Sequence, residues 1–329
     1  MNKIKIITTI IALCCHFSLS AQTDSLSIDK PLLARHIINL NFPRTRNLNI
    51  QMETGFPGNY KIKMPKYDYS EKGTIKHYTS VNVNGNFSLL RKGKFTLAGG
   101  ASYSYRNIKF SDLSSSTGNI YHGRQEGFHV FGPNATIGYG TLLFGKHVTI
   151  TGTVFCEFSP GGFELWAGIA TATMVLKSSH DEILSVGISG FTHHTSIFPV
   201  LPVFVYMRRL SPSYFFDCSL PGYCYIRRLV GTQARFSTGI DFNSDHFYVH
   251  PSTENNNEAK TLYFIKTELK LNAMYEHRLG KHLFFTAKTG YDFSFLSKFY
   301  NSDRLMRNAL GKYKEHPNFF LNIGVSYNL

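Results

Sequence analysis

Two histidines followed closely by a serine form the segment that comes nearest to a catalytic site. In His193-His194-Thr195-Ser196, His194 precedes Ser196 by two positions. Residues two apart in a strand face the same side, so the imidazole could act as a base toward the hydroxyl. No asparagine follows at a comparable distance to orient the imidazole, and the segment runs into Pro199 as a loop would. We therefore expect polar loop residues here and no enzymatic activity.

A second set of residues with chemical potential is charged and lies in phase with small or polar neighbours. The chain has 35 Lys and Arg against 21 Asp and Glu, a formal net charge of +14. On one face of a sheet, such cations could attract anions, or the carboxylates could pair with them and neutralise the face. Both interpretations stay open for the nine positions: Arg106, Arg235, Lys266, Lys270, Lys288, Glu157, Asp241, Glu268 and Asp292.

Cysteine spacing suggests one covalent link. Cys218 and Cys224 flank Pro221-Gly222, and a disulfide could join them across a hairpin in an oxidising compartment. The alternative is a pair of free cysteines on an apolar face. Cys156 is in phase with apolar neighbours, and we expect it on that face. Residue spacing predicts no metal site and no cofactor.

The segments that carry these residues alternate between apolar and polar positions. In 321–329 every odd residue is apolar and every even residue is small or polar, and 283–295, 95–106 and 148–158 behave similarly. A period of two indicates strands with one apolar face. Several segments, such as 74–90 and 259–276, are much longer than the five or so residues common in soluble sheets. Length and small polar residues together favour a barrel whose apolar face meets lipid.

Counting these segments predicts an all-β fold, a single closed antiparallel transmembrane β-barrel of about 14 strands. Twelve would be the number if the two short segments beside Pro221-Gly222 did not span. Tight turns alternate with longer polar stretches, for which we predict loops at 57–73, 111–125, 243–258 and 297–317. The predicted strands are 46–56, 74–90, 94–110, 127–143, 147–158, 163–176, 182–192, 200–209, 214–220, 223–230, 234–243, 259–276, 282–296 and 318–329.

The N-terminal residues predict export. Lys3 and Lys5 precede a short apolar run, and Ser18–Ala21 offers small residues for cleavage, so 1–21 is interpreted as a signal peptide. Lipoprotein processing at Cys14 or Cys15 is the alternative. Residues 22–45 are predicted to be a periplasmic extension or short plug, followed by an outer-membrane barrel over 46–329.

The C-terminal Tyr327-Asn328-Leu329, the turns and the signal together resemble a generic Gram-negative outer-membrane β-barrel. The segment from Pro199-Val200-Leu201-Pro202 to Leu220-Pro221 is similar to an uncharacterised outer-membrane barrel domain family, which implies the fold and the location but no activity. The His-x-Ser spacing of His194 and Ser196 is similar to that of outer-membrane phospholipases.

Export argues against nucleic acid as the partner of this basic chain. We expect basic residues of the turns to meet outer-membrane lipid and lipopolysaccharide phosphates; these are Lys92, Lys94, Lys146, Arg278 and Lys281. Three functions follow from the sequence. They are a passive channel or small transporter for polar or anionic solutes, a closed structural or interaction barrel, and a lipid-active enzyme. The channel is favoured over the closed barrel, and the enzyme comes last.

Overall fold

The computed structural model describes Phe42 and residues 46–65, 68–115, 125–179, 181–192, 199–250, 261–301 and 309–329. The predicted signal peptide, most of the predicted extension, and the pair His194 and Ser196 lie outside these residues. The strands are β1 (Leu48–Gly55), β2 (Gly58–Met64), β3 (Tyr69–Lys92), β4 (Phe95–Ser115), β5 (Gln125–Leu143), β6 (Lys146–Ser159), β7 (Gly162–Ser178), β8 (Glu182–Phe191), β9 (Val200–Arg209), β10 (Tyr214–Leu220), β11 (Tyr223–Val230), β12 (Ala234–Val249), β13 (Leu262–Arg278), β14 (Leu283–Asn301), β15 (Gly311–Glu315) and β16 (Asn318–Tyr327).

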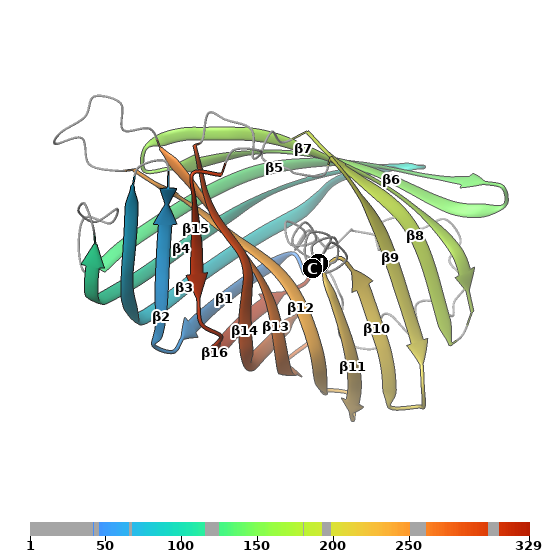
Figure 1. The fold of residues 1–329 in the computed structure, drawn as a ribbon. Coiled ribbons are helices and arrows are strands. Elements are labelled where there is room, and N and C mark those ends of the chain that lie inside the picture. Colours follow the sequence, from blue (N-terminus) through green and yellow to red (C-terminus); the bar gives the residue numbers. More distant parts are fainter. Residues whose placement is uncertain are drawn as a thin grey trace, which may run out of the picture.

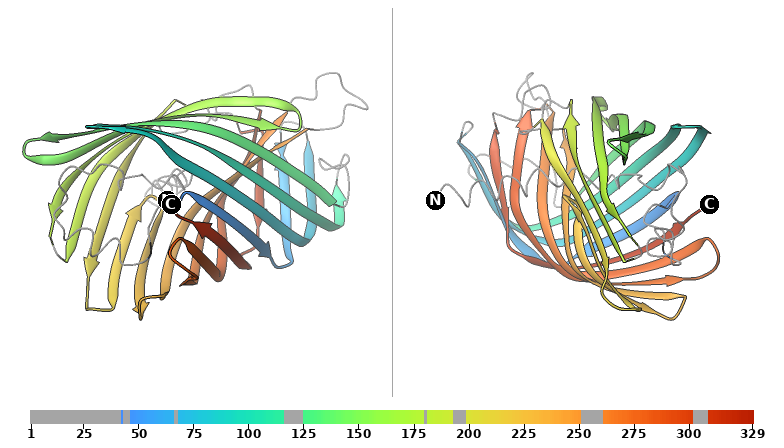
Figure 2. Two further views of the ribbon diagram at one scale, coloured as in Figure 1. Left: turned by 180° about the vertical axis from the view of Figure 1, so that it is seen from behind. Right: turned by 90° about the vertical axis from the view of Figure 1, so that its right-hand side faces the viewer.

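These segments form one antiparallel sheet that closes on itself, because β1 pairs with β3 on one side and with β16 on the other (Figures 1 and 2). β2 continues the path of β1, and β15 leads into β16. The two pairs β1–β16 and β2–β15 keep one register across the breaks, from Leu48↔Tyr327 to Lys63↔Lys312. The ring therefore has 14 strands, two of which are interrupted once, and the predicted number is confirmed.

Each interruption falls at a proline. Residues 56–57 separate β1 from β2, and residues 316–317 separate β15 from β16; Pro57 and Pro317 lie in these gaps. Proline has no N–H to donate to a ladder, so it is tolerated at a break but not inside a paired strand. Backbone hydrogen bonds resume on both sides, from Phe56 to Phe319 and from His316 to Asn59.

The two faces of the sheet are inverted relative to a water-soluble protein. Large apolar side chains are exposed around the outside, for example Ile137 (56% exposed), Ile188 (59%) and Phe236 (51%). Charged side chains such as Arg106, Glu268 and Glu276 are buried inside. An apolar exterior is stable only in lipid, where a closed barrel also satisfies every backbone group. The chain is therefore a transmembrane β-barrel of the outer-membrane type. The described residues contain no helix that is long and apolar enough to span a membrane.

The barrel has a turn end and a loop end. Tight connections such as Lys92–Phe95, Leu143–Lys146 and Val230–Ala234 all lie at the turn end, together with the C-terminus. The turn end is the periplasmic end in barrels of this type, and the longer connections face the cell exterior.

The loops were predicted to be longer than they are. β2 and β15 lie within the predicted loops 57–73 and 297–317, and β12 extends to Val249. β2 and β15 were predicted to be loops because their outer faces carry lysines, a composition that is typical of loops. Beyond the lipid, a strand needs no apolar outer face.

The wall of the barrel is uneven in height. β3 has 24 residues and β14 has 19, whereas β8, β9, β10 and β11 have 10, 10, 7 and 8. β12 pairs with β11 only as far as Tyr223↔Asp241, and the pairing described beyond that rung is with β13. Figure 1 shows β12 leaving the short β11 and running diagonally toward the loop end.

Candidate functional site in the barrel interior

The loop-end part of β12 lies against the inner face of the opposite wall. Phe128 on β5 packs on Phe247 with ring centroids 4.2 Å apart. Phe247, Tyr248 and Val249 are consecutive residues and all are buried. Because neighbouring residues of a strand point to opposite faces, both faces of β12 are covered here. This part of β12 therefore lies inside the barrel and does not form a lipid-facing wall.

Polar contacts fix β12 in this position. The Nε of Arg106, on β4, donates to Asp245 at 2.6 Å, and the hydroxyl of Tyr78 donates to the same carboxylate at 3.3 Å. On the other face of β12, the hydroxyl of Tyr248 donates to Glu157 of β6 at 2.7 Å. The Nε2 of His246 lies 3.0 Å from the same carboxylate. Both faces of the strand are thus bound across the interior.

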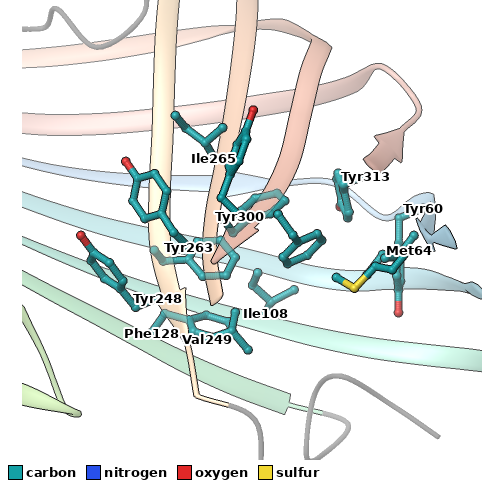
Figure 3. Close-up of a cluster of buried hydrophobic side chains, with 14 of the residues drawn as sticks. Tyr60, Met64, Ile108, Phe128, Tyr248, Val249, Tyr263, Ile265, Tyr300 and Tyr313 are labelled. Carbon is teal, nitrogen blue, oxygen red and sulfur yellow. The ribbon is translucent and has the colours of Figure 1, made fainter. Parts of the chain in front are cut away.

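An apolar cluster lies in the loop-end part of the interior, between β2–β5 and β12–β15. Figure 3 shows these side chains converging from both sides of the barrel. Burial of these side chains away from water stabilises the contact between the opposite walls. The cluster consists of Tyr60, Ile62, Met64, Ile75, Ile108, Phe110, Phe128, Val130, Phe247, Tyr248, Val249, Tyr263, Phe264, Ile265, Phe299, Tyr300 and Tyr313.

Below this cluster, lysines of β13 hold four carboxylates. Lys266 forms ion pairs with Glu268, with Asp292 at 3.2 Å and with Glu315 at 2.9 Å. Lys270 pairs with Glu53 of β1 and, at 3.3 Å, with Glu268. Charges buried away from water are stable only when they are paired in this way.

A third group connects β12, β13 and β14. Lys288 donates to Asp241 at 2.6 Å, and the hydroxyl of Tyr225 donates to the same residue at 2.6 Å. The side-chain amide of Asn272 donates to Asp241 at 3.0 Å. Both oxygens of the Asp241 carboxylate therefore accept hydrogen bonds from side chains of the barrel.

Near the turn end, one carboxylate holds several arginines. Glu276 accepts from Arg46 at 2.5 Å and from Arg235 at 2.7 Å, and Arg227 lies 3.9 Å away. Arg235 also lies over the ring of Phe42, 4.8 Å from its centroid. Phe42 is 1% exposed, so the residue near the end of the predicted extension packs inside the barrel mouth.

The wall formed by β5–β8 is lined differently. Many of its inward positions are small or polar, and some of them bond to one another, as Thr136 does to Thr153 (2.9 Å) and Thr171 to Ser189 (2.6 Å). These positions are Gly132, Asn134, Thr136, Gly138, Thr149, Thr151, Thr153, Thr171, Thr173, Ser185 and Ser189. One side of the interior is therefore charged and the other carries hydroxyls.

A pocket of about 40 Å³ lies between the apolar cluster and the ion pairs, with Glu53, Tyr78, Asp245, Lys266 and Phe320 in its lining. A space of this size holds one or a few water molecules.

Each of the nine charged residues singled out from the sequence has an oppositely charged partner in the interior, or a histidine in the case of Glu157. Their role in lining a solute path stays a proposal. Sequence reasoning missed several residues that form ion pairs in the interior: Arg46, Glu53, Asp217, Arg227, Asp245, Glu276 and Glu315.

The remaining predicted sites are simpler. A disulfide joins Cys218 and Cys224, which face each other in the β10–β11 hairpin. His246 and His250 are four residues apart on and beside β12, a spacing that sequence reasoning overlooked, and each contacts a glutamate. Among the described residues, no three His, Cys, Asp or Glu side chains are grouped so that they could hold a metal ion.

No family model matches the chain, and no curated protein matches it. Among solved structures it is similar to an outer-membrane channel from Pseudomonas putida F1 (9% identity, 87% of this chain and 97% of that chain, TM-score 0.37). It is also similar to the toluene transporter TodX of P. putida (8%, 88% and 91%, 0.34). A third is the outer-membrane protease OmpT from Escherichia coli (6%, 86% and 97%, 0.28). Similarity at this level assigns no activity to the chain.

Proposed function

We propose that this protein is a gated outer-membrane channel for small polar solutes, and that the structure is its closed state. The contact of β12 with β4–β6 carries the proposal, because it places a strand and its apolar side chains across the interior. The contact includes Arg106 with Asp245, Phe128 with Phe247, and Tyr248 with Glu157, besides the contacts of Tyr78 and His246. Beyond Asp241 the strand is paired with β13 and not with β11, so its loop-end part can move away together with β13 without breaking pairs on its β11 side.

Polar rather than anionic solutes fit the interior. The cations from which an anion preference was predicted are paired; Lys266, Lys270 and Lys288 each bind at least one carboxylate. Paired charges leave little net field to concentrate anions. The hydroxyls along β5–β8 offer donors and acceptors to a neutral polar solute, so the solute path would follow that wall.

Conductance of the refolded protein in a planar bilayer tests the proposal. The wild type is expected to be silent or to open rarely. The double variant Arg106→Ala/Asp245→Ala removes both partners, which avoids leaving an unpaired buried charge, and it is expected to show discrete openings. The matched control is Lys177→Ala/Glu182→Ala, an ion pair in the β7–β8 turn whose lysine is 57% exposed. It is expected to stay silent.

The same experiment contains the outcomes against the proposal. A wild type that conducts continuously would show an open channel. A double variant that is folded, as judged by heat-modifiable mobility on a gel, but stays silent would exclude gating by β12. The second result would favour a closed interaction barrel, for which the interior ion pairs of Arg106, Arg235, Lys266 and Lys288 are the supporting observation.

A further inference from the structure

Six lysines gather on the outer surface at the loop end of the barrel, where β3, β2, β15 and β14 lie next to one another (Figure 1). Lys61 is directly opposite Lys72 on one side and Lys314 on the other. In the neighbouring row, Lys312 is directly opposite Lys63 and Lys298. We call this surface the lysine ladder; its members are Lys61, Lys63, Lys72, Lys298, Lys312 and Lys314.

The ladder faces outward. Tyr60, Ile62 and Met64 of β2 belong to the buried apolar cluster, so the intervening Lys61 and Lys63 point away from it. On β15, Tyr313 is buried, and the residues on either side of it are exposed. The lysines thus line the face that continues the lipid-facing surface of the barrel.

Like charges directly opposite each other destabilise a sheet. The proximity of Lys63, followed by partial burial and Lys72, lowers the pKa of Lys61; burial and then Lys312 lower the pKa of Lys298. Within the part of the chain that the structure describes, none of the six lysines forms an ion pair with a carboxylate. An arrangement that costs stability in the isolated protein is expected where an external anion compensates for it.

The height of the ladder indicates which anion. Phe56 and Phe319 face each other across the break in the wall, and Tyr291 packs against Phe319. On the adjacent β14 the outward apolar side chains continue past Tyr291 to Phe293, which is 39% exposed, so Phe293 marks the membrane–water interface beside the ladder. Lys298, opposite Lys312 in the outer row, lies five residues beyond Phe293, about 17 Å along the strand. Strand tilt reduces this to roughly 13 Å above the interface.

A phospholipid headgroup layer is only about 5–8 Å thick on each side of the hydrocarbon. The row of Lys63, Lys298 and Lys312 therefore stands beyond the phospholipid phosphates, at the height of a lipid with a large head, and the row of Lys61, Lys72 and Lys314 lies two residues closer to the membrane. We infer that the lysine ladder is a binding surface for the phosphorylated saccharide head of lipopolysaccharide. Several lysine ammonium groups then share each phosphate, which removes their mutual repulsion. The basic turn residues considered in the sequence, such as Lys92 and Lys94, lie at the opposite end of the barrel.

Binding of purified lipopolysaccharide to the refolded full chain tests the inference. The variant Lys61→Gln/Lys72→Gln/Lys314→Gln removes the central row. The matched control, Lys92→Gln/Lys94→Gln/Lys281→Gln, makes the same charge change on exposed turn-end lysines. Each lysine near an anionic surface contributes about fivefold in affinity. The ladder variant is expected to bind about a hundredfold more weakly, and the control is expected to bind like the wild type.

Two further arms separate the sources of phosphate. Lipopolysaccharide whose phosphates have been removed enzymatically should bind the wild type as weakly as the ladder variant binds the intact form. Vesicles of phosphatidylcholine and phosphatidylglycerol should not distinguish the ladder variant from the control. Equal losses of affinity in both variants would show that binding depends only on net charge, which would overturn the inference. A loss confined to the ladder variant on phosphatidylglycerol vesicles would reassign the surface to phospholipid.

The unfolding temperature provides an independent test, because lipopolysaccharide should reverse the order of the ladder variant and the wild type. In detergent alone, the ladder variant should unfold at a temperature equal to or above that of the wild type, because lysine–lysine repulsion is removed. In the presence of lipopolysaccharide, the order should reverse. A ladder variant that is less stable than the wild type in both conditions would overturn the inference, since the lysines would then be structural.

Discussion

Arg106 on β4 and Asp245 on β12 are 139 positions apart in the sequence, yet the Nε of Arg106 donates to the Asp245 carboxylate at 2.6 Å across the barrel interior. This bond joins strands that are not neighbours in the sheet. It forms because β12 extends beyond the short β11 and leans inward. The closed state thus depends on a difference in strand length as well as on the two charged residues.

Replacing one partner of this pair should destabilise the barrel strongly. Asp245→Ala leaves the buried guanidinium of Arg106 without its carboxylate, which costs about 3–5 kcal/mol in the free energy of unfolding. The double variant with Arg106→Ala should lose less than the two single variants added together. Urea unfolding in lipid vesicles measures all three. Lys177→Ala and Glu182→Ala should each cost less than about 1 kcal/mol, because that pair is largely exposed. Additive losses at Arg106 and Asp245 would show that the pair is not coupled.

Glu276 should be the most sensitive carboxylate at the turn end. Glu276→Gln removes the charge that Arg46 and Arg235 share, and Arg227 lies within 4 Å of the same group. Uncompensated guanidiniums then repel one another inside the barrel, so we expect a loss of several kcal/mol. The measurement is again urea unfolding, with Glu182→Gln as the exposed control. Equal midpoints for the two variants would contradict the role assigned to Glu276.

Replacement by alanine should impair refolding at one glycine and leave it unchanged at another. At Gly290, on β14, a Cβ would lie 2.0 Å from the carbonyl oxygen of Leu271 and 2.7 Å from the Cα of Asn272. Both are backbone atoms of β13, so the ladder itself must shift. Gly280 lies in a turn with nothing within 4 Å of its Cβ position. We expect Gly290→Ala to refold poorly, as judged by heat-modifiable mobility, and Gly280→Ala to refold like the wild type. Normal refolding of both would show that β13 and β14 tolerate wider spacing.

The disulfide between Cys218 and Cys224 should be detectable by thiol titration. A chain that begins at residue 22 and carries Cys156→Ser has only these two cysteines. Under denaturing conditions we expect no free thiol before reduction and two after it. Because the bond closes a short loop, its loss should cost no more than about 2 kcal/mol. Two free thiols in the unreduced protein would exclude the bond.

The local pattern of the sequence predicted most of the wall. Alternation in 283–295 and 321–329 placed strands to within a few residues, because lipid on one side and a polar interior on the other impose a period of two. It also placed Lys266, Lys270 and Lys288 on the polar face. It failed where strands rise above the lipid. There β2 and β15 have lysines on the outer face, and the composition resembles that of a loop.

The sequence by itself therefore determined that the chain is a membrane barrel, predicted about 14 strands with 12 as the alternative, and placed nine charged residues on the polar face. Only the tertiary structure decided whether those charges face an open path. The partners of Arg106 and Lys270 lie on β12 and β1, distant in the sequence, and a period of two carries no information about which strands meet across the interior. That depends on the relative lengths of β11 and β12 and on the closure of the ring, which place Phe128 against Phe247.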